Sequence, residues 1–499
     1  MQTTEIIETS VGMVRGYIDG DLKVFKGIPY AERPIGELRF KPPVPRKKWF
    51  GVFDALDYSP ICVQNADYPG WTLPPTPQSE ADSLTLNIWT PGTDNKKRSV
   101  MVWFHGGGMS SGSGRLPNGF KLARRGDIVV VSINYRLGAL GFSEIKGIES
   151  NIGILDQIEA LKWIQKNIEF FGGDPDCITI FGFSAGGWSV SILMGIPASK
   201  GLFNRVIAQS GAAHPLSFQT KNGMEISKRV LKTLKINEGD IESLRRITAN
   251  ELVEVHTKIA NEVEWTTGPW VLVVPPYIDG STIPEHPLGM IKKGIASDID
   301  LMVGCTLNES IPKIKPNSEK LDMGEVKRRI VKAIKLLGHD DKKGLEMFEV
   351  YKDAGDPEAI LTAFSTDLDF RISAIRLAEE QSVHTPRTYM YLFTYPLKIQ
   401  GKEYGAFHGG DVGFIHGSLD NPKMGVEIDN LEEAQPLSEK MMDSWIAFAK
   451  TGNPNHEGIE EWSKYDINTR KTMFLGKDTI SVDDPMKKQR IAWADIMKI

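Results

Sequence analysis

The stretch from Phe171 to Gly187, FGGDPDCITIFGFSAGG, decides the fold. A turn rich in glycine precedes a short apolar run, Ile178–Phe181, which predicts a strand, and the small residues after Ser184 predict the start of a helix. Between them lies a G-x-S-x-G pattern, whose turn is so tight that both flanking positions must nearly lack side chains. Such a turn leaves the serine exposed. The pattern alone also occurs as an ordinary Gly-Ser turn, so the predicted strand before it and the predicted helix after it are what indicate a nucleophile elbow.

Upstream, the run Ser99–Phe104 predicts a buried strand that leads directly into His105-Gly106-Gly107-Gly108. Glycines in that place let backbone N–H groups point at a negative charge developing on an oxygen, together with the N–H after the nucleophile. The glycine run alone is also consistent with a tight loop or a weak phosphate cradle, although the G-K-[ST] ending of a phosphate-binding loop is missing. The two motifs in this order favour an acyl-transfer hydrolase.

Apolar runs and helical patterns alternate on both sides of these motifs, as in parallel α/β folds. Apolar residues at positions 154, 158, 161, 164 and 168 give one helix an apolar face. Further strands are predicted at Asp127–Asn134, Arg205–Gln209, Asp300–Gly304 and Thr388–Phe393, and a last helix at Ser438–Lys450. Residues 217–286 and 311–380 are rich in helical patterns and charge. We expect one α/β domain over residues 1–499, with a large, mostly parallel, twisted sheet flanked by helices and with helical insertions that roof the active site.

Composition narrows the range of partners. The chain has 499 residues, of which 41% are hydrophobic and 25% charged, and its net charge is −5 without a basic stripe, so we expect no nucleic-acid partner. No apolar run approaches the ~20 residues of a membrane span. Three scattered cysteines and nine histidines without metal-ligand spacing indicate neither a disulfide framework nor a metal site. We expect a cytoplasmic protein that acts on a small molecule without a metal or organic cofactor; the oligomeric state stays open.

Four motifs spread over nearly the whole chain carry a resemblance to a known family. They are FKGIPYAERPIGELRFKPP (Phe25–Pro43), DSLTLNIWTP (Asp82–Pro91), FGGDPDCITIFGFSAGG (Phe171–Gly187) and FAKTGNPN (Phe448–Asn455). In these motifs the chain resembles the type-B carboxylesterase/cholinesterase family of α/β-hydrolases, and within it the bacterial para-nitrobenzyl-type esterases. The resemblance implies an α/β-hydrolase fold and hydrolysis of carboxylic esters.

The family's catalytic serine, glutamate and histidine match three positions of this sequence. Ser184 lies in the elbow, Glu309 ends a G-x-x-x-[DN]-E pattern that begins at Gly304, and His408 opens the segment His408-Gly409-Gly410-Asp411. Without the resemblance, His408 could not be chosen among nine histidines, and His416 is a rival. The resemblance implies an acyl-enzyme on Ser184, with His408 as general base and acid and Glu309 orienting the imidazole.

The same resemblance assigns supporting residues. Gly107, Gly108 and Ala185 match the family's oxyanion-hole donors, and Ser210 matches a serine that supports the catalytic acid. Arg136 and Asp174 match a structural ion pair. These roles are implied by the match alone.

Several positions depart from the family pattern. Phe183 precedes the nucleophile where relatives carry Glu or Gln; it either disfavours choline esters by removing a carboxylate or simply packs under the elbow. Ser83 stands in the place of a family cysteine, which leaves Cys62 without its usual disulfide partner and is consistent with a reducing compartment. Trp71, Phe364 and Phe370 are, with Phe183, candidates for the substrate pocket.

The sequence therefore predicts a serine carboxylesterase for uncharged short- to medium-chain or aryl esters. A triad fixes the nucleophile but not the leaving group, so amide or carbamate hydrolysis remains an alternative. A non-catalytic esterase-like binding protein is a second alternative, although such relatives usually lose a triad residue, and this chain retains Ser184, Glu309 and His408.

Overall fold

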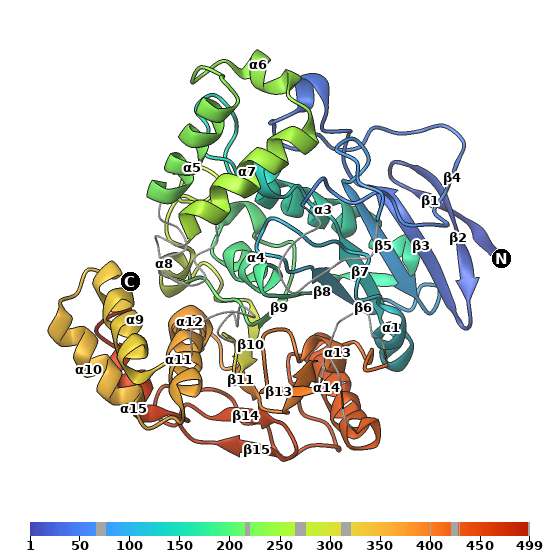
Figure 1. Ribbon diagram of the computed structural model, residues 1–499. Helices are drawn as coiled ribbons and strands as arrows, with labels where there is room; N and C mark the ends of the chain where they lie inside the picture. The colour runs from blue at the N-terminus through green and yellow to red at the C-terminus, as the bar shows by residue number, and fades with distance from the viewer. Residues whose placement is uncertain are drawn as a thin grey trace.

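The computed structural model of the protein describes residues 1–65, 76–214, 220–264, 276–310, 321–399, 401–420, 428 and 430–497. One large sheet crosses the molecule (Figure 1), with thirteen strands among the described residues in the order β1-β2-β3-β5-β7-β6-β8-β9-β10-β11-β14-β15, and β4 pairing with β2. The strands are β1 Thr3–Thr9, β2 Gly12–Asp19, β3 Leu22–Pro29, β4 Val52–Asp54, β5 Thr85–Thr90, β6 Arg98–Phe104, β7 Val129–Ile133, β8 Gly173–Phe183, β9 Arg205–Gln209, β10 Asp300–Thr306, β11 Thr388–Phe393, β14 Thr472–Leu475 and β15 Thr479–Val482.

The centre of the sheet is parallel, from β7 through β6, β8, β9, β10 and β11 to β14. The strands β1, β2, β3, β5 and β7 pair in antiparallel order at one margin, where only β4 runs parallel to its partner β2, and β15 is antiparallel at the other margin. The central strands are apolar on both faces because helices cover both faces of a parallel sheet. The α/β sheet and the six strands predicted between Ser99 and Phe393 are confirmed. The strands before β6 were not predicted individually.

Alternate side chains of the central strands enter two cores. Val100 and Val102 of β6 pack on the face covered by α3 (Ile152–Asn167) and α4 (Ala185–Met194). Met101 and Trp103 of the same strand pack on the opposite face, which is covered by α1 (Phe120–Gly126) and α14 (Leu431–Thr451). The period-2 alternation of a strand thus assigns each residue to one core.

Helix α14 begins seven residues before the predicted start at Ser438. Pro436 lies inside it, and proline removes an intrahelical hydrogen bond, which is why the sequence pattern places the start too late. The helix is begun by Asn430, whose side chain accepts hydrogen bonds from the N–H groups of Glu432 and Glu433, and it ends at Gly452 in a left-handed conformation.

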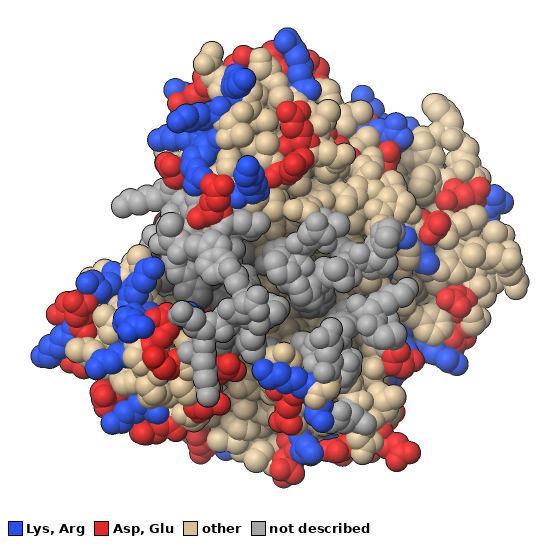
Figure 2. All heavy atoms as spheres, viewed as in Figure 1, with Lys and Arg blue, Asp and Glu red and all other residues tan. Residues whose placement is uncertain are grey.

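The helix-rich segments stand beside the sheet as two groups (Figure 1). The first contains α5 Thr220–Thr233, α6 Ile241–Arg246 and α7 Ala249–Glu264; the second contains α9 Met323–Leu336, α10 Asp341–Tyr351, α11 Pro357–Thr366 and α12 Ile372–Ser382. Figure 2 shows cationic and anionic side chains interspersed over the outer surfaces of both groups. Among the described residues, no helix has the length and apolar character to cross a membrane.

Candidate active site

Ser184 occupies a sharp turn between β8 and α4, at φ 56° and ψ −121°. A side chain at Gly186 would place its Cβ 1.9 Å from the carbonyl oxygen of Phe104, and one at Gly182 would meet the backbone of Gly186 at 2.6 Å. The glycines are therefore required by the neighbouring strand and by the turn itself. The Ser184 N–H donates to the carbonyl of Gln209, the last residue of β9, at 2.9 Å. This hydrogen bond holds the turn in its uncommon backbone conformation.

Three polar side chains meet at the carboxyl ends of the parallel strands. Nε2 of His408 lies 2.9 Å from Oγ of Ser184, and Nδ1 of the same ring lies 2.5 Å from Oε2 of Glu309. The carboxylate is fully buried, whereas 21% of the histidine side chain is exposed. The arrangement connects a hydroxyl, an imidazole and a carboxylate in one hydrogen-bonded chain, which is the geometry that removes a proton from a serine.

The glutamate and histidine are held by a junction between two loops. Glu309 follows β10, and its second oxygen accepts the backbone N–H of Thr306 at 2.7 Å. Asn308 donates its N–H to the carbonyl of Ala406 at 2.9 Å, and its side-chain oxygen accepts the N–H of Ala406 at 3.0 Å. Because Ala406 lies two residues before His408, this pair of hydrogen bonds fixes the acid relative to the imidazole.

The glycine loop after β6 lies against the elbow. A Cβ on Gly106 would lie 3.1 Å from the Cβ of Ser184, and Gly107 and Gly108 have φ of 114° and 62°. The loop is closed by hydrogen bonds from the N–H groups of Ser110 and Ser111 to the carbonyl of Gly107, at 3.0 and 2.9 Å. Among the described residues, the N–H groups of Gly107, Gly108 and Ala185 have no hydrogen-bond acceptor and so are available to one.

Two further buried carboxyl groups lie close enough to Glu309 to interact with its charge. Tyr391 donates its hydroxyl to Asp411 at 3.0 Å, and Ser310 donates its hydroxyl to Asp369 at 3.2 Å. Burial, and to a smaller extent the negative charge of Glu309, raise the pKa of Asp411 to about 7. Burial likewise raises the pKa of Asp369 well above its ordinary value. Asp411 and Asp369 therefore keep their protons to a higher pH than ordinary carboxyl groups do.

Of the four pocket candidates, two contact the imidazole. The rings of Phe183 and Phe370 lie 4.6 and 4.8 Å from the ring of His408, measured between centroids. Phe364 packs instead against Tyr351 and Trp493, at 5.5 and 5.4 Å, and is 1% exposed, so its observed place is in the core. Trp71 lies outside the described residues.

His416, the rival to His408, is buried in the core covered by α1 and α14, next to Trp103 and Phe181, whose rings lie 4.7 and 5.7 Å from it. Burial lowers its pKa to about 3, because the charged imidazolium loses its hydration there. The ring therefore stays neutral and lies among apolar side chains, apart from Ser184.

The predicted ion pair between Arg136 and Asp174 is wrong. Arg136 instead pairs with Asp156 of α3, through Nε at 2.8 Å and Nη2 at 2.6 Å, and both side chains are buried. The match placed the acid at the start of β8, but Asp156 in the second turn of α3 pairs with Arg136. Asp156 lies four residues from both Ile152 and Ala160 on a second buried face of α3, and this spacing is the signal that could have identified it.

The structure leaves the predicted role of Ser210 untested, and it has Cys62 without a disulfide, as expected. Ser210 has φ of 46° and donates its N–H to the carbonyl of Gly304 at 2.8 Å, while its hydroxyl has no hydrogen-bond partner among the described residues. Its predicted support of Glu309 stays a prediction, since the bond observed to that carboxylate comes from Thr306. Cys62 is free, as are Cys177 and Cys305.

A serine elbow between a strand and a helix, with a glycine loop beside it on a mostly parallel sheet, defines an α/β-hydrolase. Residues 3–494 match the model of the carboxylesterase family, and the chain belongs to that family. Its general activity is accordingly the hydrolysis of carboxylic esters.

Relatives and solved structures similar to this chain extend over the same length. The para-nitrobenzyl esterase of Bacillus subtilis (strain 168) is 34% identical over 98% of each chain, and the phenmedipham hydrolase of Pseudarthrobacter oxydans is 33% identical over 97% of each. A solved thermophilic para-nitrobenzyl esterase superposes with a TM-score of 0.87 at 33% identity, covering 98% of this chain and 99% of its own.

Proposed function

We propose that the chain, as a single domain over residues 1–499, is a serine carboxylesterase for uncharged short- to medium-chain or aryl esters. The observation that carries the proposal is the hydrogen-bonded chain from Ser184 Oγ through His408 to Glu309, with 2.9 and 2.5 Å between the bonded atoms. Three independent segments contribute to it, so a chance alignment of the three groups is a poor explanation.

In the first half of the reaction, Oγ of Ser184 attacks the ester carbonyl carbon while Nε2 of His408 takes the hydroxyl proton. The negative charge that develops on the carbonyl oxygen is accepted by the N–H groups of Gly107, Gly108 and Ala185, each worth about 3 kcal/mol in comparable hydrolases. Glu309 accepts the Nδ1–H of His408 and stabilises the imidazolium. The imidazolium then gives its proton to the departing alcohol, and the acyl group stays on Ser184.

In the second half, a water molecule attacks the acyl-enzyme, and His408 takes its proton by the same Nε2 atom. The tetrahedral intermediate collapses, the proton returns to Oγ of Ser184 and the carboxylic acid leaves. These steps need no group beyond the side chains and backbone of the chain itself.

The preference for uncharged esters rests on the surroundings of the imidazole. Phe183 and Phe370, both about 5% exposed, contact the ring of His408, and no carboxylate stands next to the nucleophile on the elbow. A cationic acyl or alcohol group there would lose hydration without gaining a counter-charge at position 183. Changing Phe183→Glu should raise the rate on butyrylcholine relative to an uncharged butyryl ester; an unchanged ratio would contradict this part of the proposal.

The first test is hydrolysis of para-nitrophenyl esters from acetate to decanoate by the wild type and by Ser184→Ala. Activity that disappears in the variant, together with loss of labelling by a fluorophosphonate, is the expected result. Ser191→Ala is the matched control, because Ser191 lies in α4 with its hydroxyl donated to Trp188 and should leave both readouts unchanged. Residual activity in folded Ser184→Ala would overturn the assignment of the nucleophile, and inactivity of the wild type on all esters would direct the search to amides and carbamates.

The three free cysteines are compatible with a reducing compartment, and we propose a cytoplasmic location on that basis.

A further inference from the structure

The imidazole of His408 packs against two aromatic rings from distant parts of the chain. Phe183 approaches at 4.6 Å with 45° between the ring planes, and Phe370 at 4.8 Å with 38°. Trp188 stacks beyond Phe370, at 6.4 Å and 10° between the planes. We call Phe183 and Phe370 the aromatic clamp. Both side chains are about 5% exposed, so they face the protein interior and the imidazole rather than solvent.

Each ring of the clamp has a rigid backbone behind it. Phe183 is the last residue of β8, next to the constrained turn at Ser184, and its aromatic edge would lie 3.0 Å from a Cβ on Gly106. Phe370 lies in a single π-helical turn, Asp367–Arg371, between α11 and α12. Such turns have an additional residue per turn and occur frequently at functional sites, where they re-aim a side chain.

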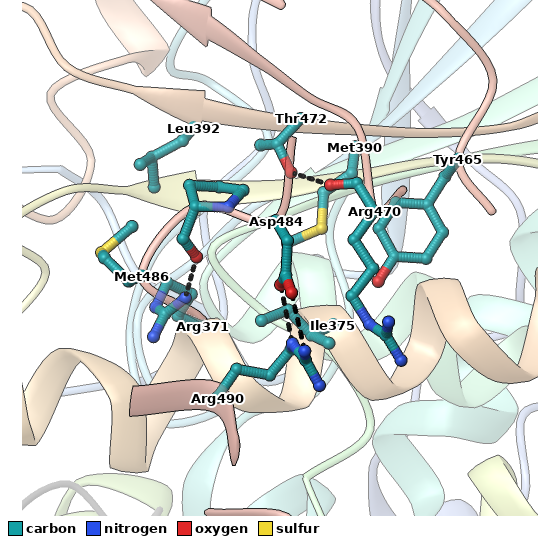
Figure 3. A pocket seen from close by; sticks show the side chains of 11 residues that line it. Arg371, Ile375, Met390, Leu392, Tyr465, Arg470, Thr472, Asp484, Met486 and Arg490 are labelled. Atoms are coloured by element: carbon teal, nitrogen blue, oxygen red, sulfur yellow. Dashed lines mark hydrogen bonds and ion pairs between the residues drawn. The ribbon is translucent and has the colours of Figure 1, made fainter. Parts of the chain in front are cut away.

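The π-helical turn is fixed by a buried ion pair. Arg371 donates Nη2 to Asp367 at 2.7 Å, and the two side chains are 2% and 4% exposed. Tyr351 donates its hydroxyl to the same carboxylate, and Trp493 donates Nε1 to the oxygen of Tyr351 at 2.6 Å. Arg371 also lines a small cavity together with Leu392, Met486 and Arg490, and Arg490 pairs with Asp484 there (Figure 3). These contacts leave Phe370 little freedom to move away from His408.

We propose that the aromatic clamp positions His408 during catalysis; this inference rests on the proposed function and deepens it. The imidazole must keep Nδ1 on Glu309 and Nε2 on Ser184, and a rotation of the ring would break both bonds. Two rings packed against the imidazole restrict that rotation without competing for hydrogen bonds. An aromatic ring also carries a negative face that attracts a cation, so the clamp favours the imidazolium formed in the transition state over the neutral ring.

The clamp predicts a particular split of the kinetic constants. An interaction that strengthens only in the transition state changes kcat and leaves KM nearly unaltered. Replacing one ring by leucine, which keeps an apolar side chain of similar size, removes the aromatic face. We expect Phe183→Leu and Phe370→Leu each to lower kcat on para-nitrophenyl butyrate about tenfold, equivalent to about 1.4 kcal/mol in the barrier, with KM changed less than about twofold.

Phe181→Leu is the matched control. Phe181 lies on the same strand two residues before Phe183, is fully buried, and stacks on another histidine, His416, at 5.7 Å. It therefore loses the same packing without touching His408, and we expect a lower Tm with kcat retained. As a positive control, Phe370→Tyr keeps the aromatic face and should keep kcat within about threefold of the wild type. The proton NMR resonance of the imidazole N–H bound to Glu309 should broaden in the two leucine variants of the clamp and not in Phe181→Leu.

The outcomes separate the inference from the proposed function. Loss of activity in Ser184→Ala with tenfold lower kcat in the two leucine variants supports both. Loss in Ser184→Ala with leucine variants that behave like Phe181→Leu overturns the clamp and leaves the triad. Activity retained in Ser184→Ala overturns the proposed function itself. An equal kcat in Phe370→Leu and Phe370→Tyr would show that the rings act only by filling space, and this result would also overturn the clamp.

Discussion

Two regions of the molecule build the site in different ways. The first is the elbow region, from β6 to β9, and the second comprises the segments that carry Glu309, His408 and Phe370. In the elbow region, contacts with adjacent parallel strands fix the glycine loop and Ser184, and each functional atom lies within a few residues of the motif that announces it. Glu309 and His408 come from two separate loops and Phe370 from a π-helical turn, and they meet only through tertiary contacts such as the Asn308–Ala406 junction. Local backbone geometry therefore positions the nucleophile, whereas contacts between distant segments place the residues that activate it.

The largest expected effect tests the long-range part of this contrast. Glu309→Gln keeps the size of the side chain but removes the charge that stabilises the imidazolium, and it favours the wrong tautomer of His408. We expect kcat to fall by about 10³- to 10⁴-fold with the fold intact, as for the corresponding change in other triads. Steady-state rates on para-nitrophenyl butyrate measure this. Glu285→Gln, at an exposed ion pair with Lys293, serves as the control, and a similar loss there would show that the assay responds to general destabilisation.

The next effect concerns the scaffold that supports both regions. Arg136→Met leaves the carboxylate of Asp156 buried without its partner, which costs about 3–5 kcal/mol in the free energy of unfolding. Asp174→Asn, at the partner first expected from the family match, should cost less than about 0.5 kcal/mol. Urea denaturation of the two variants measures the difference. An equal loss of unfolding free energy in the two variants would show that Asp174 is also a structural partner of Arg136.

A third variant tests the elbow region, where local backbone geometry places the glycine loop. Gly107→Ala would bring a Cβ within 2.2 Å of the Ser111 carbonyl oxygen at a φ of 114°, so the loop must shift and carry its N–H away from the oxyanion. We expect kcat to fall about 10²- to 10³-fold. Gly201→Ala has the same left-handed backbone, φ 80°, with no atom within 4 Å of the added Cβ, and should reduce stability without changing kcat. Retained kcat in Gly107→Ala would remove this loop from the proposed oxyanion hole.

The smallest effect concerns pH. The pKa of Asp411 in the folded protein is raised to about 7, whereas an unfolded aspartate titrates near ~3.9. Between these values the folded state holds a proton that the unfolded state has released, so the free energy of unfolding falls as pH rises from about 4 to about 7. Asp411→Asn keeps an acceptor for Tyr391 but cannot titrate, and its stability should depend less steeply on pH. Parallel slopes in urea titrations from pH 4 to 8 would contradict the assignment.

The same contrast explains what could be predicted from the sequence. The strands at Ser99–Phe104 and Arg205–Gln209 were predicted because their burial appears directly in continuous apolar runs. The elbow was predicted because a tight turn demands glycines at fixed positions. The amphipathic strands at the margin, such as β1, have weaker patterns and depend on pairing to form.

The remaining features could not be predicted because nothing local encodes them. Which histidine meets Ser184 depends on where the loop after β13 (Lys402–Gly405) returns to the sheet, and only the family resemblance indicated His408. The π-helical turn that aims Phe370 depends on a buried ion pair and on Tyr351. Phe364 and Phe370 look alike in the sequence, but only Phe370 lies against the imidazole.

The separation of the three polar groups along the chain has a consequence for synthesis. His408 is 224 residues from Ser184 and 99 from Glu309, so the nucleophile leaves the ribosome long before the groups that activate it. Contacts of such sequence separation form late and slowly because a long loop must close first. A nascent chain therefore passes through a stage in which it contains the serine but cannot react with esters. Appearance of esterase activity during translation would then report completion of the tertiary fold rather than formation of its first domain-sized core.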